Sequence, residues 1–142
     1  MTENCYQSSG TATMLLPCSG ASNTGQLANR AAVELTREGV GKMFCLAGIG
    51  GRLSGFVQSA KDTESVLVID GCRMACGKAV LESAGIQEFK HLVVTEYGVE
   101  KENGFNLSDE DVDLIKEAVK NEISASQSGP TVPRISGCCC CG

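Results

Sequence analysis

The sequence predicts a single α/β domain of three layers, in which a mainly parallel sheet of about four strands lies between helices on both faces. Three observations predict this fold. The chain has 142 residues, a length that suits one domain. Short apolar runs alternate along it with longer segments of helical periodicity. One run, SVLVID at 65–70, is apolar and largely β-branched between its ends, as expected for a parallel strand covered on both faces.

Each element is predicted from its own local pattern. Leu27, Ala31 and Leu35 form an apolar stripe on the first helix, and Gly39 is placed to end it. The segment DGCRMACGKAVLESA is expected to form a tight turn and then a helix that ends before Gly85, and the loop GIGG is expected to follow the second strand. In chain order the predicted strands are 13–17, 42–47, 65–70 and 91–95, and the other predicted helices are 26–38, 53–60 and 109–123.

The last helix marks the end of the predicted domain. Ser108 followed by Asp111 resembles a capping box at its start. The sequence SASQSGPTVPRISGCCCCG that follows it is small, polar and interrupted by two prolines, which is typical of a flexible tail. We therefore predict a disordered N-terminal segment at 1–10, an α/β domain at 11–124 and a flexible tail at 125–142 that ends in Cys138, Cys139, Cys140 and Cys141.

Composition disfavours several classes of partner. The chain has 12 Lys and Arg against 17 Asp and Glu, no Trp, and a net charge of −5, so we expect no nucleic-acid partner. It begins without a basic and then apolar leader, and no window approaches the roughly 18 apolar residues of a membrane span, so we expect no membrane association. The nine cysteines are an odd count in a chain of this size. We expect a cytoplasmic protein with reduced thiols.

The predicted topology brings several cysteines to one edge of the sheet. Right-handed crossovers place the carboxyl ends of all parallel strands on the same edge, where ligands bind in open α/β folds. Cys18 directly follows the first strand, Cys72 follows the third, and Cys76 is expected about one turn into the next helix. Cys45 is expected inside the second strand, facing either this edge or the core.

These thiols have the chemistry of a metal site. On a helix, Cys72 and Cys76 would have Cβ atoms roughly 5 to 6 Å apart, close enough to bind one ion, and the helix N-terminus with Arg73 would favour thiolates. Zinc takes four ligands in a tetrahedron, which Cys18 and Cys45 would complete. The amides of the loops CSGASNTG and GIGG are then expected to donate to the sulfurs. The alternative is that the four cysteines are small buried hydrophobic residues.

Three motifs in the sequence resemble those of a known protein family. The string IDGCRMACGKAVLE, with PCSG before it and FCLAGIGG between, resembles the DGC domain family over about residues 13–120. This family is named for its Asp-Gly-Cys motif, here Asp70, Gly71 and Cys72, and is described as zinc-binding from its cysteine pattern. The resemblance implies Cys18, Cys45, Cys72 and Cys76 as chelating residues, and so favours Cys45 as a ligand. It implies no reaction. Ser19 and Gly20 of PCSG also belong to the resemblance.

Two further side chains have expected roles near the site. Asp70 ends the third strand, where capping the next helix is favoured over acting as a base beside a metal. His91 is the only histidine and opens the fourth strand, so we expect it at the opposite edge of the sheet, away from the cysteines. Glu96 and Tyr97 follow that strand on the cysteine side, where ligand contact and ordinary turn polarity both remain open.

The leading hypothesis is a protein that holds one zinc ion in a structural or regulatory role. An alternative is a redox enzyme in which Cys72 is the nucleophile and Cys76 or Cys18 resolves it, acting on a disulfide, a persulfide or a thiol-reactive oxyanion, with a thiol or redox protein as partner. An iron–sulfur cluster on the same four thiolates is a third hypothesis. The run at Cys138–Cys141 has two alternatives: metal capture or thiol exchange, and a dispensable extension.

Overall fold

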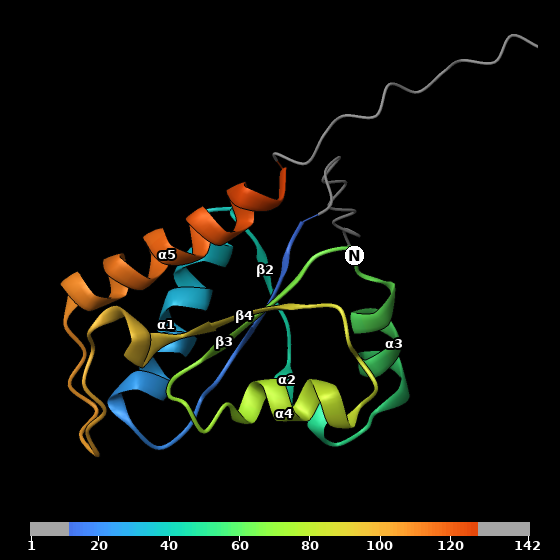
Figure 1. Ribbon diagram of the computed structural model, residues 1–142, viewed down its shortest axis with the longest axis horizontal. Coiled ribbons are helices and arrows are strands. Elements are labelled where there is room, and N and C mark those ends of the chain that lie inside the picture. The colour runs from blue at the N-terminus through green and yellow to red at the C-terminus, as the bar shows by residue number, and fades with distance from the viewer. Residues whose placement is uncertain (1–11, 128–142) are drawn as a thin grey trace, which may run out of the picture.

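The computed structural model describes residues 12–127 and confirms the predicted α/β architecture. Its four strands are all parallel, in the order β2-β1-β3-β4 (Figure 1). The elements are β1 (Met14–Pro17), α1 (Asn23–Arg37), β2 (Lys42–Met43), α2 (Leu46–Gly50), α3 (Ser54–Asp62), β3 (Val66–Asp70), α4 (Cys76–Ser83), β4 (Lys90–Val93), the 3-10 helix η1 (Val94–Tyr97) and α5 (Asp109–Gln127).

Helices cover both faces of the sheet, which gives the three predicted layers. Helices α1 and α5 lie on one face, and α2, α3 and α4 lie on the other (Figure 1). Leu15 and Ile69 pack in the cluster of the first face, and Leu16 and Val68 pack in the cluster of the second. Successive residues of a strand face opposite sides, so a strand buried on both sides must be apolar at every position. All five residues of β3 are buried, including Asp70 at its end.

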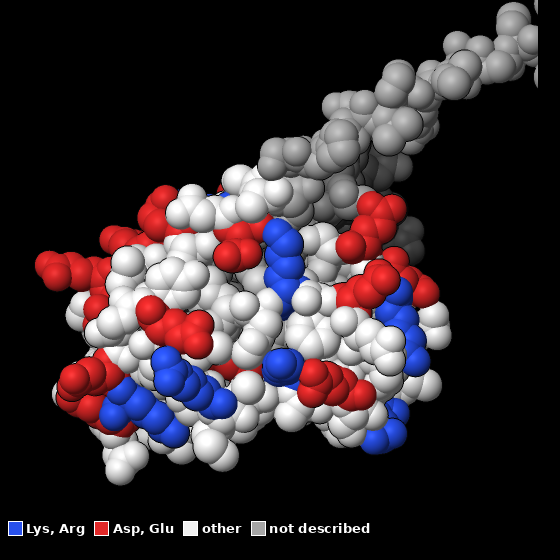
Figure 2. Space-filling view, in the orientation of Figure 1, with Lys and Arg blue, Asp and Glu red and all other residues white. Residues whose placement is uncertain are grey.

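Charged side chains on the surface are mixed in sign. Figure 2 shows acidic and basic side chains interspersed over the face in view.

None of the helices in the described part of the chain combines the length and the apolar character needed to cross a bilayer.

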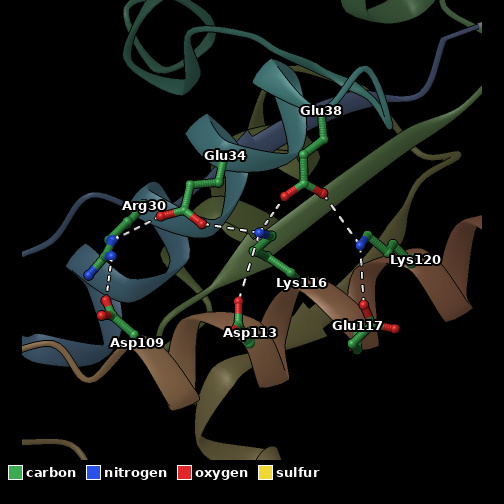
Figure 3. A network of polar contacts seen from close by, with 8 residues as sticks. All are labelled: Arg30, Glu34, Glu38, Asp109, Asp113, Lys116, Glu117 and Lys120. Atoms are coloured by element: carbon green, nitrogen blue, oxygen red, sulfur yellow. Dashed lines mark hydrogen bonds and ion pairs between the residues drawn. The ribbon is translucent and has the colours of Figure 1, made fainter.

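An ion-pair network joins α1 to α5 across their exposed sides (Figure 3). Lys116 of α5 is its centre: its Nζ lies 3.1 Å from a Glu34 carboxylate oxygen and also contacts Glu38, both on α1. Arg30 lies 2.6 Å from Asp109 at the start of α5. The network therefore links the two helices of one layer through several ion pairs. Beneath it, the two helices also pack through a buried cluster that includes Val112 and Ile115.

The second strand is shorter than predicted. It covers Lys42–Met43 instead of 42–47, and the predicted GIGG loop lies largely in the short helix α2. A β-carbon on Gly48 would lie 2.5 Å from the ring of Phe56, so glycine here lets α2 pack directly against α3. The glycines that predicted a loop serve a close helix contact, which a local pattern does not distinguish from a turn.

Helix α4 begins later than predicted, and this changes the cysteine geometry. It starts at Cys76, and Cys72 lies in a preceding turn closed by a bond from the Ala75 amide to the Cys72 carbonyl. Ala75 has φ 51° and ψ 45°, a left-handed conformation that interrupts the helix. The predicted helical pairing of Cys72 and Cys76 on successive turns is therefore wrong.

Further boundaries differ from those predicted, since α1 begins at Asn23 instead of 26 and α3 ends at Asp62 instead of 60. The chain leaves β4 at Val93 and continues as η1, and α5 continues past Ile123 to Gln127. Ser108 accepts a hydrogen bond from the Asp111 amide at 3.0 Å, as the capping box predicts. The predicted disordered segment at 1–10 and the cysteine run Cys138–Cys141 lie outside the described residues.

Candidate thiol site

The four cysteines within residues 12–127 lie on loops or helix starts at the carboxyl edge of the sheet. Cys18 follows β1, Cys45 precedes α2, Cys72 follows β3 and Cys76 begins α4. All four are free thiols. We call the edge formed by these four residues the cysteine edge. Because the strand order is β2-β1-β3, Cys45, Cys18 and Cys72 come after three neighbouring strands, which lie about 4.8 Å apart in a sheet.

The loop after β1 folds back on its own cysteine. The Gly20 amide donates to the Cys18 sulfur at 3.4 Å. The Gln26 side chain donates to the carbonyl oxygens of Ser19 and Gly20, which ties the loop to α1. A β-carbon on Gly25 would lie 2.9 Å from the Gly20 backbone, so the loop rests directly on the helix. Ser19 and Gly20 thus hold the half-buried Cys18 through backbone groups.

Cys45 is the N-cap of α2. Its sulfur accepts a hydrogen bond from the Gly48 amide at 3.4 Å, and the residue is exposed. The alternative that Cys45 faces the core is therefore wrong. The two predicted amide donors, one from each glycine-containing segment, are both present, at Gly20 and Gly48.

Cys72 is half-buried and accepts a hydrogen bond from a residue that the sequence did not single out. The ammonium group of Lys101 lies 3.5 Å from its sulfur. Lys101 belongs to the segment between η1 and α5, which contains no regular secondary structure. Nothing in the local pattern of that segment points to a cysteine on another loop. Arg73, predicted beside the site, is exposed and lies 4.0 Å from Glu96.

Asp70 is a buried cap, as predicted, but it caps a helix that starts at Cys76. Its side chain accepts hydrogen bonds from the amides of Gly77 at 2.7 Å and Lys78 at 3.0 Å. These amides belong to the first turn of α4, where backbone N–H groups lack partners within the helix. Asp70 is 1% exposed, and its carboxylate therefore fixes the start of the helix that carries Cys76.

His91 lies closer to this region than the sequence predicts. It is paired in register with Val68, and its Nε2 lies 2.8 Å from an Asp70 oxygen. The strand places its backbone away from the cysteine edge, but the side chain reaches the carboxylate two residues before Cys72. His91 therefore supports the cap of α4 from the fourth strand, a contact that the strand assignment alone does not reveal.

The chain matches a known protein family. The model of the DGC domain matches residues 14–119, most of the chain. The chain belongs to the DGC domain family. The three residues of its Asp-Gly-Cys motif do different things: Asp70 caps α4, Gly71 allows a close backbone contact, and Cys72 presents a thiol. A β-carbon on Gly71 would lie 2.7 Å from the Gly25 amide nitrogen.

A curated relative has the same domain character. This chain is 34% identical over 102 residues to the anaerobic and virulence modulator AnvM of Pseudomonas aeruginosa. The aligned residues make up 72% of this chain and 78% of the relative. No solved structure matches the chain.

The cysteine edge is an open array of thiols. Within residues 12–127, no three His, Cys, Asp or Glu side chains are close enough together to hold a metal ion. The donor set fits a thiophilic ion in its chemistry, because four thiols share one edge and two of them already accept backbone N–H groups. The loops that carry the thiols would have to close around an ion to bind it.

Proposed function

We propose that this protein binds one zinc ion through the thiolates of Cys18, Cys45, Cys72 and Cys76, in a structural or regulatory role. One observation carries the proposal. Three of the four sulfurs, on loops beside three neighbouring strands, each accept an N–H donor, from Gly20, Gly48 and Lys101. Hydrogen bonds of this kind orient metal-bound thiolates and offset their charge.

The alternative of a packing role for these cysteines is weakened by their exposure. Cys45 and Cys76 are exposed, and Cys18 and Cys72 are half-buried. A cysteine kept for its small hydrophobic volume is usually fully buried. The core beneath the edge is already filled by aliphatic side chains such as Leu15 and Ile69, both 0% exposed. Cys18 packs partly against this core, whereas the exposed thiols of Cys45 and Cys76 are available for chemistry at the surface.

Zinc bound by four thiolates would join the loops after β1, β2 and β3 to the start of α4. With all four positions taken by protein, the ion has no open position for substrate, so its role is structural or regulatory. The relative named as a modulator supports a regulatory role. Thiolate ligands need a reducing environment, and we therefore also propose that the protein acts in the cytoplasm.

The test is the metal and acid-labile sulfide content of the full chain, purified under reducing, anaerobic conditions. We expect about one zinc per chain and no sulfide, and we expect zinc to be lost in Cys72→Ser. A control chain with all four cysteines of the terminal run changed to serine should keep its zinc. Wild-type protein without metal, or Cys72→Ser with full zinc content, would reject the proposal. Sulfide with iron would instead support a cluster on the same thiolates.

The contact between Lys101 and Cys72 also favours a second candidate, a thiol-based redox function with a redox protein as partner. A cation beside a partly exposed thiol is typical of reactive cysteines. Oxidation of the metal-free chain followed by peptide mapping tests it. A disulfide from Cys72 to Cys76 or Cys18 that forms ahead of others supports this candidate, and random pairing contradicts it.

A further inference from the structure

Lys101 meets Cys72 across a large distance in sequence, and the structure holds both partners in place. The two residues lie on different loops, and a contact of 3.5 Å between the ammonium group and the sulfur connects their side chains. Lys101 is exposed, and an exposed lysine usually loses too much side-chain freedom for one contact to be effective. The question is therefore what fixes its backbone.

Asn23, the first residue of α1, fixes the backbone on both sides of Lys101. Its side-chain amide donates to the Glu100 carbonyl at 2.8 Å, and its side-chain oxygen accepts from the Glu102 amide at 2.7 Å. Its own backbone amide donates to the Glu102 carbonyl at 3.1 Å. Asn23 thus donates two hydrogen bonds and accepts one, and these three bonds hold the backbone on both sides of Lys101 within an otherwise irregular segment.

The same turn of α1 also supports Cys72. Gly71 packs against Thr24 and Gly25 so closely that a β-carbon there would lie within 2.9 Å of three of their backbone atoms. The residue before Cys72 and the residues beside Lys101 are therefore both anchored on the residues 23–25. This shared support sets the distance between ammonium and sulfur through backbone contacts.

We propose that Lys101 belongs to the functional site at the cysteine edge, where it donates a hydrogen bond to the Cys72 sulfur and offsets the negative charge of its thiolate. Asn23 is the residue that positions Lys101. The effect of Lys101 on zinc binding rests on the proposed zinc function. Four thiolates around a divalent ion leave two negative charges in excess, and a fixed ammonium group at one sulfur offsets part of this charge. Lys101 thereby favours binding of a cation by thiolates, although it is itself a cation.

The first test measures zinc affinity of the full chain by competition with a chromophoric chelator. Lys101→Met should weaken binding by about 10- to 100-fold, the usual effect of removing a hydrogen-bond partner of a ligand. Lys101→Arg keeps the charge and the donor and should stay close to wild type. Asn23→Ala should weaken binding less than Lys101→Met does. The matched control is Lys61→Met, which removes an exposed lysine of α3.

The second test uses the metal-free chain, so its result does not depend on whether the protein binds zinc. Brief alkylation with iodoacetamide, in which sulfur displaces iodide, is mapped to each cysteine by mass spectrometry. Lys101→Met should lower the labelling of Cys72 relative to Cys18 in the same chain by at least about threefold. Lys101→Arg should restore the wild-type ratio. An unchanged or increased ratio in Lys101→Met, or the same change in Lys61→Met, would overturn the assignment of Lys101.

Discussion

His91 Nε2 and Asp70 Oδ2 lie 2.8 Å apart, and this contact joins the fourth strand to the start of helix α4 through one buried carboxylate. The same carboxylate accepts the amides of Gly77 and Lys78. Asp70 therefore has three partners from two elements while only 1% of it is exposed. A buried carboxylate needs such partners, because its transfer from water is costly without them.

Removal of the Asp70 carboxylate should destabilise the protein strongly. Asp70→Ala leaves the buried Gly77 amide and the partly buried Lys78 amide without this acceptor, and a buried unsatisfied group costs about 1–3 kcal/mol. We expect a loss of roughly 3 kcal/mol in the free energy of unfolding, measured by urea denaturation. Asp70→Asn keeps one oxygen acceptor and should lose less. The control Asp62→Ala, at the exposed end of α3, should change stability by less than about 0.5 kcal/mol. A similar small change in Asp70→Ala would contradict this role.

Gly71 should not tolerate even a methyl group. A β-carbon there would collide with the backbone of Thr24 and Gly25, and backbone atoms of a helix cannot move aside cheaply. We expect Gly71→Ala to lower the free energy of unfolding by about 1–3 kcal/mol, the usual cost of overpacking. Gly104→Ala is the matched control, because a β-carbon at Gly104 meets nothing within 4 Å. Equal free energies of unfolding in the two variants would contradict the prediction that the close contact at Gly71 excludes a side chain.

The fold could be predicted further than the details of the site. The buried strand β3 is apolar at every position before Asp70, so its pattern predicts a parallel sheet and the edge at which Cys18 and Cys72 lie. The start of α4 could not be predicted, because it depends on a left-handed residue at Ala75 and on capping by Asp70 from another element. Both are tertiary effects that helix periodicity does not contain.

Contacts between distant segments account for the side-chain partners that the sequence does not predict. Lys101 reaches Cys72 only because Asn23 holds the segment around it, and His91 reaches Asp70 only across neighbouring strands. Neither pair has a fixed spacing along the chain. A single sequence predicts which residue types share an edge, whereas the partners of each side chain follow from the packing of the elements.

The network around Lys116 should make stability depend on pH in the acidic range. The hydrogen bond from Lys116 is the largest cause that lowers the pKa of Glu34, and also of Glu38, below the ordinary value of 4.5. A carboxyl group whose pKa is lower in the folded state stabilises the fold above its unfolded pKa, and this contribution is lost as pH falls through the folded pKa. Wild-type protein should therefore lose stability from about pH 5 downward.

Lys116→Met tests this dependence. Without the ammonium group both pKa values should return toward 4.5, so the urea midpoint of the variant should fall less steeply below pH 5 than that of wild type. Wild type should be the more stable at pH 7, and the difference should narrow at pH 3 and at high salt. Lys61→Met serves as the control for loss of an exposed positive charge. A difference between wild type and Lys116→Met that stays constant from pH 7 to pH 3 would rule out the network as its cause.

Removal of zinc should lower the thermal stability of the full chain without unfolding it. The two aliphatic clusters on either face of the sheet involve none of the proposed ligands as a fully buried member, so the metal-free chain retains its core. An ion that binds only the folded state raises stability by RT ln(1 + [L]/Kd), about 2.7 kcal/mol at a free concentration of 100 times Kd. The unfolding midpoint under reducing conditions should therefore rise with free zinc and fall after chelation. Cys72→Ser should show neither change, because it lacks a ligand, and a wild-type midpoint that is insensitive to zinc would exclude a structural role for the metal.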